Sequence, residues 1–376
     1  MAFLIGGANS AADTGYDIEN SCRINPGDEG SLSFTLGTPT SQRIATFSAW
    51  GKFNGQRSGS HDNSFWSFGD DAGQAINIVR TNGTPQIFID DSDGVYLNFN
   101  NAPFLRDSSA WYHLFVQIDT TQSTATNRMK FFINGTQLDN TLASHESSPD
   151  EDYDIPGLAS GQVLRISARA GTTHFIDGYI AEMIYLDGTV GAISDFGETD
   201  SASGIWKPKK YTAGNFGNNG AWLEFKQSGT GADASGIGAD TSGNDNHFAI
   251  VGDLNSRDIQ TDTPTNNFAT MKIHGAAAVS GAVLAEGNLK CTTGTSGSGR
   301  DLGRIFISNI LMSSGKWYWE AKMADTVFQI GLSAYQGSLL GNTTNNTRFL
   351  VLNSNGELSD KADSSESQDT YMASVS

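Results

Sequence analysis

The chain has 376 residues, of which only 17% are charged, and 41 acidic against 23 basic residues give a net charge of -18. This length suffices for two domains that each bury a core. The acidic balance argues against a groove for nucleic-acid phosphates and against an anionic membrane surface, because both would require a basic stripe. The one short basic cluster is Lys207-Pro208-Lys209-Lys210.

Cysteine usage and the N-terminus bear on the compartment in which the protein is made. Cys22 and Cys291 fall in different expected modules, so two inert buried thiols are favoured over a disulfide, and a reducing site of synthesis is compatible. The apolar start, residues 1–7, lacks the basic region and the length of a secretory signal. No apolar run approaches the ~20 residues of a membrane helix, so we expect no membrane insertion.

The first third of the chain predicts β-strands. Residues 1–20 show no strand alternation, and we expect an arm that docks onto a neighbouring protein, with a frayed terminus as the alternative. Strand signals begin where Leu32, Phe34 and Leu36 alternate with small polar residues. Further strands are predicted at 45–53, 64–69 and 86–90.

The clearest strand is predicted over 111–119, because its apolar residues alternate over the whole length. The residues expected on one face are Tyr112, Leu114, Val116 and Ile118. After a polar loop, the strand 129–136 contains Asn134-Gly135, which favours a type I′ hairpin turn because both central positions need a positive φ. Later strands are predicted at 163–168, 174–188 and 221–225.

A second sandwich is predicted to begin near Phe268. Trp317 and Trp319 alternate with polar residues, and Ile330 and Leu332 share a face in the next strand. The Gly- and Ser-rich stretch before Phe268 predicts the end of the first module and a linker. The predicted domains are 1–20 (N-terminal arm), 21–252 (first sandwich), 253–267 (linker) and 268–376 (second sandwich).

An ordered series of motifs resembles the joint between two β-sandwich modules in structural proteins of tailed bacteriophages. The series comprises 241–248, Asp262-Thr263-Pro264-Thr265-Asn266-Asn267-Phe268, 284–290 and 313–320. The Trp111-Tyr112-His113 strand followed by a Phe-x-Asn-Gly hairpin resembles the signature of the first module. The resemblance implies an all-β fold, in which a concanavalin A-like (laminin G or pentraxin type) jelly roll precedes an incomplete SPRY-like sandwich.

The resemblance also implies a role in the virion. It points to a tail or head fibre or spike component, made in the host cytoplasm, whose first module attaches to a host-surface polysaccharide or receptor. The implied partners are other virion proteins and further copies of this chain, a trimer by analogy with fibres. The alternative is an architectural protein that decorates or bridges the capsid or tail and binds no ligand.

The second module departs from the SPRY pattern. The sequence stops at 371–376, about where the remaining SPRY strands would begin. We expect either a truncated module or a fragment of a longer protein. A neighbouring chain would then cover the strand edges that a half sandwich exposes.

No catalytic constellation is found in the sequence, and we expect the protein not to be an enzyme. Hydrolases of the jelly-roll architecture carry Glu-x-Asp-x-x-Glu on one strand, and that motif is absent. The nearest carboxylates are Asp177, Glu182 and Asp187, of which the first and last look like turn residues beside glycines. Zinc-protease, nucleophile-elbow and phosphate-loop motifs are also absent. His113 is interpreted as a structural residue of a core strand, not as a ligand.

No cofactor is expected, with calcium as an open alternative. Asp90-Asp91-Ser92-Asp93-Gly94 and the acidic run 150–154 offer oxygen ligands, although the first is ordinary hairpin chemistry and the second is typical of a solvated loop. Sugar stacking is open for Trp66, Trp111 and Tyr153, with a core role favoured for each. The aromatic residues interpreted as core or sheet-face are Trp50, Trp222, Trp317 and Trp319.

Overall fold

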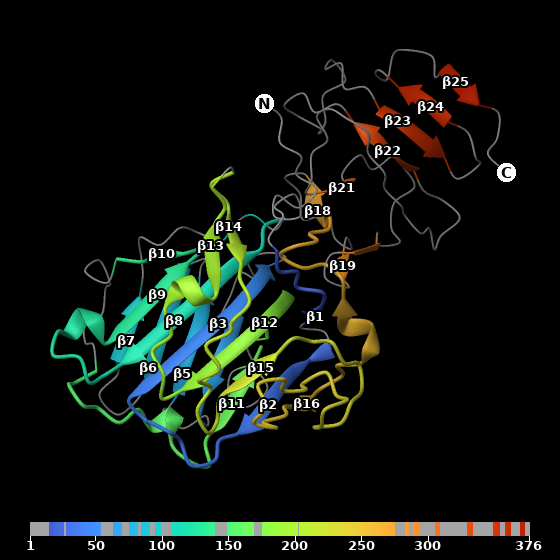
Figure 1. The fold of residues 1–376 in the computed structure, drawn as a ribbon. Helices are drawn as coiled ribbons and strands as arrows, with labels where there is room; N and C mark the ends of the chain where they lie inside the picture. Colours follow the sequence, from blue (N-terminus) through green and yellow to red (C-terminus); the bar gives the residue numbers. More distant parts are fainter. Residues whose placement is uncertain are drawn as a thin grey trace. The chain divides into compact units, whose positions relative to one another are not determined.

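The chain forms two β-rich units, seen here in a computed structural model (Figure 1). Unit 1 comprises Met1–Thr270, Ala285–Lys290 and Asn309–Leu311, and unit 2 comprises Met271–Leu284, Cys291–Ser308 and Met312–Ser376. The structure describes residues 15–25, 28–53, 63–69, 75–81, 84–90, 95–98, 105, 107, 109–139, 149–168, 175–201, 203–274, 283–285, 289–292, 305–308, 329–333, 349–353, 358–361 and 369–372.

Unit 1 is an antiparallel β-sandwich of two sheets. The first sheet has eight strands in the order β10-β9-β8-β3-β12-β1-β17, with β15 also paired to β12. Its strands are β1 (Ser21–Ile24), β3 (Ile44–Phe53), β8 (Tyr112–Asp119), β9 (Met129–Ile133), β10 (Thr136–Gln137), β12 (Gly178–Asp187), β15 (Ala221–Leu223) and β17 (Ile259–Gln260).

The second sheet of unit 1 has seven strands in the order β16-β2-β11-β4-β5-β6-β7. Its strands are β2 (Ser31–Thr35), β4 (Asn63–Phe68), β5 (Ala75–Thr81), β6 (Thr84–Asp90), β7 (Val95–Asn98), β11 (Val163–Ile166) and β16 (Ala249–Val251). Strands distant in sequence pair within both sheets, as a jelly roll requires. The predicted all-β, jelly-roll class is confirmed.

The core of unit 1 lies between the two sheets, where every second residue of each strand meets the facing sheet. Phe47 of β3 stacks on Tyr185 of β12, with ring centroids 4.9 Å apart, and meets the edge of Phe68 from the second sheet. The predicted inward residues of β8, Leu114, Val116 and Ile118, belong to this core, and Tyr112 packs partly buried against it. The alternation of apolar residues along β8 therefore predicted correctly which face of the strand points into the core.

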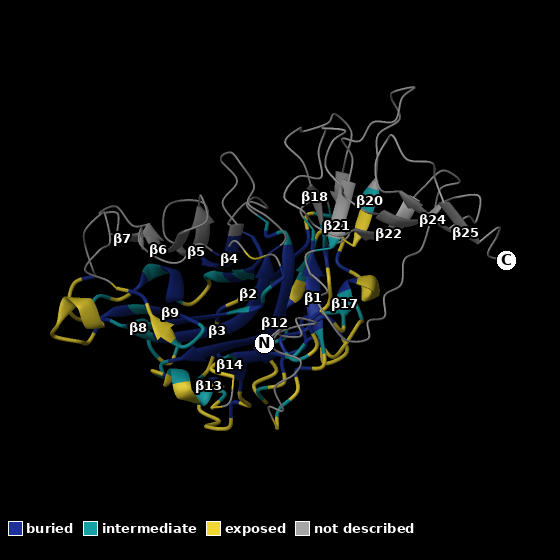
Figure 2. Cartoon of the chain, turned by 90° about the horizontal axis from the view of Figure 1, so that it is seen from above, coloured by how far each residue is buried: buried dark blue, intermediate teal, exposed yellow. Residues whose placement is uncertain are grey.

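The outer face of the eight-stranded sheet is covered as well. All ten residues of β12 are buried, and so are nine of the ten residues of β3 (Figure 2). Two further apolar clusters occupy this face, and the hairpin β13 (Gly197–Thr199)–β14 (Trp206–Pro208), the loop after it and the N-terminal segment contribute to them. The central strands of the first sheet are thus buried from both sides.

Turn chemistry agrees with the sequence at the β9–β10 hairpin. Ile133 pairs with Thr136, and Asn134 and Gly135 between them have φ of 47° and 78°. Two positive φ values at the centre of a two-residue loop define the predicted type I′ turn. The described 3-10 turns are η2 (Ala125–Asn127), η4 (Pro156–Leu158), η5 (Ile193–Asp195) and η6 (Ser256–Asp258).

The segment predicted as a linker, 253–267, is instead part of unit 1. Its strand β17 pairs with β1, and η6 begins with a capping box formed by Asn255 and Asp258. The preceding Gly-rich stretch is also ordered into tight turns, with Gly229 bridged to Gly236. The polar residues that suggested a linker instead form the hydrogen bonds of these turns.

Unit 2 consists of short antiparallel strands in its described part. The strands are β18 (Met271–His274) paired with β21 (Ile305–Ser308), and a four-stranded sheet of β22 (Gln329–Ser333), β23 (Phe349–Asn353), β24 (Leu358–Lys361) and β25 (Asp369–Met372) in sequence order. The paired strands β19 (Val283–Ala285) and β20 (Lys290–Thr292) each have one terminal residue, Ala285 and Lys290, that belongs to unit 1. The predicted strand with Ile330 and Leu332 is β22. Trp317, Trp319 and residues 1–14 of the predicted arm lie outside the described residues. Within those residues no helix could cross a membrane.

Candidate functional site

The buried polar groups of unit 1 gather on the outer face of the eight-stranded sheet. Because side chains alternate along a strand, the residues of β3 between the core positions Phe47, Ala49 and Phe53 point outward. These outward residues are Ser48, Trp50 and Lys52. Lys52 and Trp50 contact chain segments that lie over this face, and Ser48 bonds to His113, which in turn bonds to Trp206 of β14. This face is therefore the candidate site.

Lys52 is the most unusual residue of the site, because its ammonium is fully buried. The side chain of Lys52 is 0% exposed, and its Nζ lies 2.7 Å from Oδ2 of Asp262 and 2.8 Å from Oδ1 of Asn267. The Nζ also donates to the carbonyl oxygen of Phe268 at 2.6 Å. All three ammonium donors are therefore satisfied by residues 262–268, which we call the closing segment.

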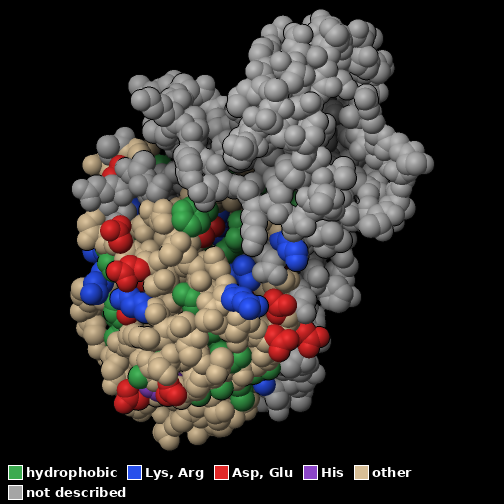
Figure 3. Space-filling model, turned by 90° about the vertical axis from the view of Figure 1, so that its right-hand side faces the viewer, with side chains coloured by type: hydrophobic (Ala, Val, Ile, Leu, Met, Phe, Trp, Pro, Cys, Tyr) green, Lys and Arg blue, Asp and Glu red, His purple; other side chains and the backbone are tan. Residues whose placement is uncertain are grey.

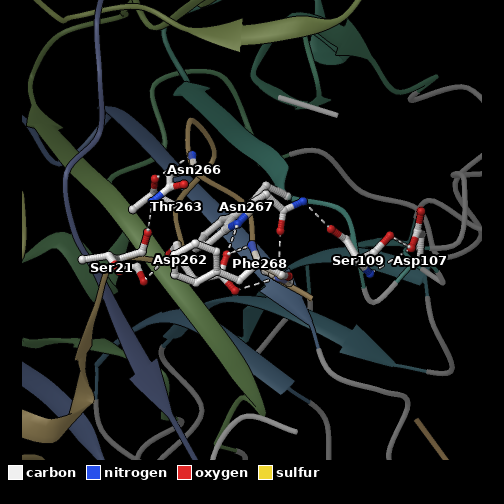
Figure 4. A network of polar contacts seen from close by, with 11 residues as sticks. Ser21, Asp107, Ser109, Asp262, Thr263, Asn266, Asn267 and Phe268 are labelled. Carbon is white, nitrogen blue, oxygen red and sulfur yellow. Dashed lines mark hydrogen bonds and ion pairs between the residues drawn. The ribbon is translucent and has the colours of Figure 1, made fainter. Parts of the chain in front are cut away.

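The closing segment is itself held by β1 and by the residues just before β8 (Figure 4). Asp262 accepts hydrogen bonds at Oδ1 from the Trp111 indole at 3.0 Å and from the Phe268 backbone at 3.2 Å. Ser21 donates to the Asp262 carbonyl oxygen, and Asn267 Nδ2 donates to the carbonyl oxygen of Ser109 at 2.6 Å. Burial lowers the pKa of the Lys52 ammonium, and the nearby Asp262 charge opposes that effect.

The N-terminal segment 15–20 docks beside the closing segment. Ile18 is buried against Trp50, and its backbone N–H and carbonyl oxygen both bond to Oγ1 of Thr265, each at 3.1 Å. The Tyr16 hydroxyl donates to Oε1 of Glu182 at 2.6 Å. This described part of the predicted arm therefore packs on unit 1 itself.

Glu182 occupies a β-bulge in the middle of β12. The β12–β3 register shifts between Ala181 and Ile184, and Glu182 has a φ of 51°, a conformation that non-glycine residues rarely adopt. On the edge of β12 that faces away from β3, β1 pairs with residues up to Ile180 and β15 pairs with residues from Met183 onward. The bulge lies at this change of partner strand. Burial raises the pKa of Glu182 to about 7, although the hydrogen bond from Tyr16 acts against that rise.

His113 of β8 has a structural role, as predicted. Its ring is stacked between Trp50, at 4.9 Å between centroids, and Trp206, at 6.0 Å. The Trp206 indole donates to Nδ1 at 3.0 Å, so the proton of the neutral ring is on Nε2, which donates to Ser48 Oγ at 2.8 Å. Burial lowers the pKa of His113 to about 3, so the ring is neutral at physiological pH.

Two glycines make room for Trp206. A Cβ on Gly197 would lie 2.4 Å from Cζ2 of Trp206, and one on Gly135 would lie 2.5 Å from Cε3. Any larger residue at either position would collide with the indole ring. The Asn134-Gly135 turn thus serves both the hairpin and the cover over His113.

The three carboxylates singled out from the sequence do not form a catalytic pair. Asp187 is buried at the end of β12, where it accepts hydrogen bonds from the backbone N–H groups of Thr40, Ser41 and Asn219. Five positions along a strand separate it from Glu182, a distance of roughly 15 Å. Glycoside hydrolysis needs carboxyl groups about 5 to 10 Å apart. Asp177, expected in a turn, precedes the first residue of β12.

The acidic run 150–154 is paired with arginines. Arg43 contacts Asp152 at 3.0 Å and Asp154 at 2.7 Å, and Arg128 lies 3.6 Å from Glu151. No group of three or more His, Cys, Asp or Glu side chains among the described residues could hold a metal ion. Residues 91–94 of the other calcium candidate lie outside the described part.

The aromatic candidates for sugar stacking are core residues. Trp66 is 0% and Trp111 3% exposed, and Tyr153 packs half-buried against the core. Trp66 points inward from β4, and the Trp111 indole is engaged by Asp262, so neither is a surface platform. The sheet-face prediction for Trp50 and Trp222 agrees with their burial.

The thiols and the basic cluster are also accounted for. Cys22 is buried, Cys291 is half-buried, both are free, and burial raises the pKa of each thiol. Lys207 of the basic cluster pairs with Glu198 and Asp200 at 3.4 and 3.6 Å. On the face drawn in Figure 3, acidic and basic side chains are scattered among each other, with no basic stripe among its described residues.

Sequence reasoning missed the cluster of Lys52, Asp262, Asn267 and Ser109. The one signal in the sequence is a lysine inside the otherwise apolar and aromatic strand Ala49-Trp50-Gly51-Lys52-Phe53. A buried lysine needs partners, and those partners stand more than 200 positions away.

Comparison with known proteins supplies fold-level likenesses only. No family model matches the sequence, and no curated protein sequence matches it. A proposed carbohydrate-binding protein from Bacteroides ovatus matches 68% of this chain and 62% of its own length, with 13% identity and a TM-score of 0.43. A heptameric SAP-like pentraxin from Limulus polyphemus matches 47% of this chain and 80% of its own, with 14% identity and a TM-score of 0.34.

The mouse laminin α1 chain, domains LG4-5, matches 96% of this chain and 68% of its own, with 8% identity and a TM-score of 0.35. Likenesses of this size say nothing about what this chain binds.

Proposed function

We propose that this chain is a non-enzymatic structural protein of a bacteriophage virion whose jelly-roll unit attaches to a host-surface glycan or receptor through its rim loops. One observation carries the non-enzymatic part. On the outer face of the eight-stranded sheet, three buried ionisable groups, Lys52, Glu182 and His113, each bond to a segment that covers the sheet. A group committed to holding a cover is not free for acid–base chemistry on a substrate.

The virion part of the proposal rests on the ordered motif series. Residues 262–268, which carry the resemblance to tailed-phage proteins, form the closing segment of unit 1 directly before unit 2 begins. The strongly acidic composition suits a soluble protein displayed at high local copy number. We propose a homo-oligomer, a trimer by analogy with fibres, with a SPRY-type second unit and other virion proteins as neighbours. Multivalent display would compensate for weak binding at each site.

The second candidate is an architectural protein that binds no ligand, and one observation favours it. Trp66 and Trp111, two of the three aromatic side chains considered for sugar stacking, are buried and cannot stack on a sugar at the surface. A glycan site would then depend on Tyr153 and on loop residues.

The experiment is binding of the purified, folded protein in its native oligomer to candidate host cells, with and without calcium and with host polysaccharide as competitor. Saturable binding that the polysaccharide abolishes supports the adhesive role, and absence of binding leaves the architectural one. The variant Tyr153→Ala tests that side chain, with Tyr153→Phe as the matched control that keeps the ring. Release of reducing ends from the polysaccharide would refute the non-enzymatic proposal.

A further inference from the structure

The cluster around Lys52 brings three different polar groups together in the interior of unit 1. A primary amine, a carboxylate and a carboxamide converge, because Lys52 Nζ contacts both Asp262 and Asn267. A buried ion pair alone recovers its desolvation cost poorly and is weak evidence of stabilisation. The carboxamide beside the amine adds a reactive partner that an ion pair does not need.

We propose that Lys52 and Asn267 form an intramolecular isopeptide bond, with Asp262 as the carboxyl group that transfers protons. The product would be a covalent link from the central strand β3 to the closing segment. The two residues are 215 positions apart in sequence.

The distances place the reacting atoms close to an attack geometry. Lys52 Nζ lies 2.8 Å from Asn267 Oδ1, and a C=O bond is about 1.2 Å long, so the nitrogen is within about 4 Å of the carboxamide carbon. Productive attack needs about 3 to 3.5 Å. A small rotation of the Asn267 side chain would close the gap. Two buried groups held this near each other react as if at a very high local concentration.

The step balances without any external reagent. The Lys52 ammonium gives one proton to Asp262, whose Oδ2 lies 2.7 Å away, and becomes a neutral amine. The amine nitrogen bonds to the Asn267 carboxamide carbon, the bond from that carbon to Nδ2 breaks, and the released nitrogen leaves as ammonia. Asp262 returns its proton to the leaving nitrogen, which departs as ammonia. Asp262 then accepts the second proton from the new amide nitrogen and passes it to the departing ammonia, which reaches water as ammonium, so Asp262 ends as a carboxylate again. No oxidation or reduction occurs.

The surroundings favour the neutral amine and hold the carboxyl group in place. Burial lowers the pKa of Lys52, which raises the share of the nucleophilic form. Trp111 and the Phe268 backbone N–H both bond to Asp262 Oδ1, which leaves Oδ2 directed at the amine. The Asn267 Nδ2 donates to the Ser109 carbonyl oxygen, which orients the leaving group. The Tyr179 ring lies 5.7 Å from Nζ and helps to exclude water.

Intact mass spectrometry of the unfolded, full-length protein tests the proposal. Cross-linking would lower the mass by about 17 Da, the mass of one ammonia, relative to the value calculated from the sequence. A tryptic digest would then contain residues 44–57 joined to residues 258–272, because trypsin does not cut at a modified Lys52. A mass equal to the sequence value in the incubated, folded protein would overturn the proposal.

A loss of ammonia without the joined peptides would also overturn it, because cyclisation of an asparagine within one peptide gives the same mass change. The variants Asn267→Ala and Lys52→Met should abolish both the mass loss and the joined peptides. The matched control is Asn266→Ala, because the Asn266 side chain is exposed and bonds to the Thr261 carbonyl oxygen, not to Lys52. That control should retain both signals. The wild-type measurement decides the question even if a variant fails to fold.

Discussion

Replacing Glu182 by Gln should stabilise the protein at neutral and alkaline pH and should leave it nearly unchanged in acid. Glutamine resembles the protonated glutamic acid in shape and charge but cannot ionise. Glu182 is 5% exposed as a residue, and burial raises the pKa of its carboxyl from an ordinary value of 4.5 to about 7. The folded state therefore keeps a proton that the unfolded state releases over this pH range.

The sign and the size follow from proton linkage. Below pH 4.5 both states hold the proton, and the group contributes no pH dependence. Between pH 4.5 and 7 the folded state binds more protons, so stability falls as pH rises, by about 1.4 kcal/mol per pH unit. The loss totals about 3 kcal/mol and stays constant above pH 7. The variant lacks this loss, so its advantage should grow from near zero at pH 4.5 to about 3 kcal/mol at pH 8.

Urea unfolding of both proteins at several pH values between 4.5 and 8, followed by tryptophan fluorescence, measures the difference in free energy of unfolding. All other titrating groups are shared by the two proteins and cancel in that difference. Glu198→Gln is the matched control, because it removes the same charge from a half-exposed side chain paired with Lys207. An advantage of Glu182→Gln that is the same at every pH would refute the reasoning.

Three further predictions concern side chains that hold the outer cover and the rim. Gly197→Ala should destabilise unit 1 by about 1 to 3 kcal/mol in urea unfolding, because the added Cβ meets the Trp206 ring; in a Trp206→Ala background most of that cost should vanish. His113→Leu should cost about 1 to 3 kcal/mol by leaving the Trp206 and Ser48 partners unpaired. Because burial lowers the pKa of His113 to about 3, that cost should be full above pH 6.5 and should shrink as the pH falls, which the same titration checks. Asp187→Ala should lower the free energy of unfolding by about 3 kcal/mol or more, because three backbone N–H groups lose their acceptor. Faster amide hydrogen exchange in the loops at residues 40 and 219 would show that the effect arises there.

The strands could be predicted from the sequence where one local rule decides them. Period-two alternation gave β2 and β8, and the Asn134-Gly135 dipeptide gave the type I′ turn, because both signals lie within a few residues. The role of His113 followed from its place on a core strand. These features need no knowledge of distant parts of the chain.

The cover over the eight-stranded sheet could not be predicted in the same way. Whether Lys52 is exposed or buried depends on Asp262 and Asn267, which no local pattern connects to it. Asp262 was recognised as part of a joint between modules, and the structure places it inside unit 1. The bulge at Glu182 escaped prediction because its cause is a change of neighbouring strand, from β1 to β15.

The closing segment sets the order in which the nascent chain can mature. Its bonds span 210 residues to Lys52 and 247 to Ile18, so the part of the outer face that the closing segment covers stays open until residues 262–268 are translated. At the usual speed of a ribosome, those 210 residues take roughly 10 to 40 s. For that time Lys52 is hydrated and charged, and the aromatic side chains that Ile18 later covers are accessible to chaperones or to other chains. The contacts between the closing segment and Lys52 can form only when residue 268 has left the ribosome, directly before the first strand of unit 2 follows.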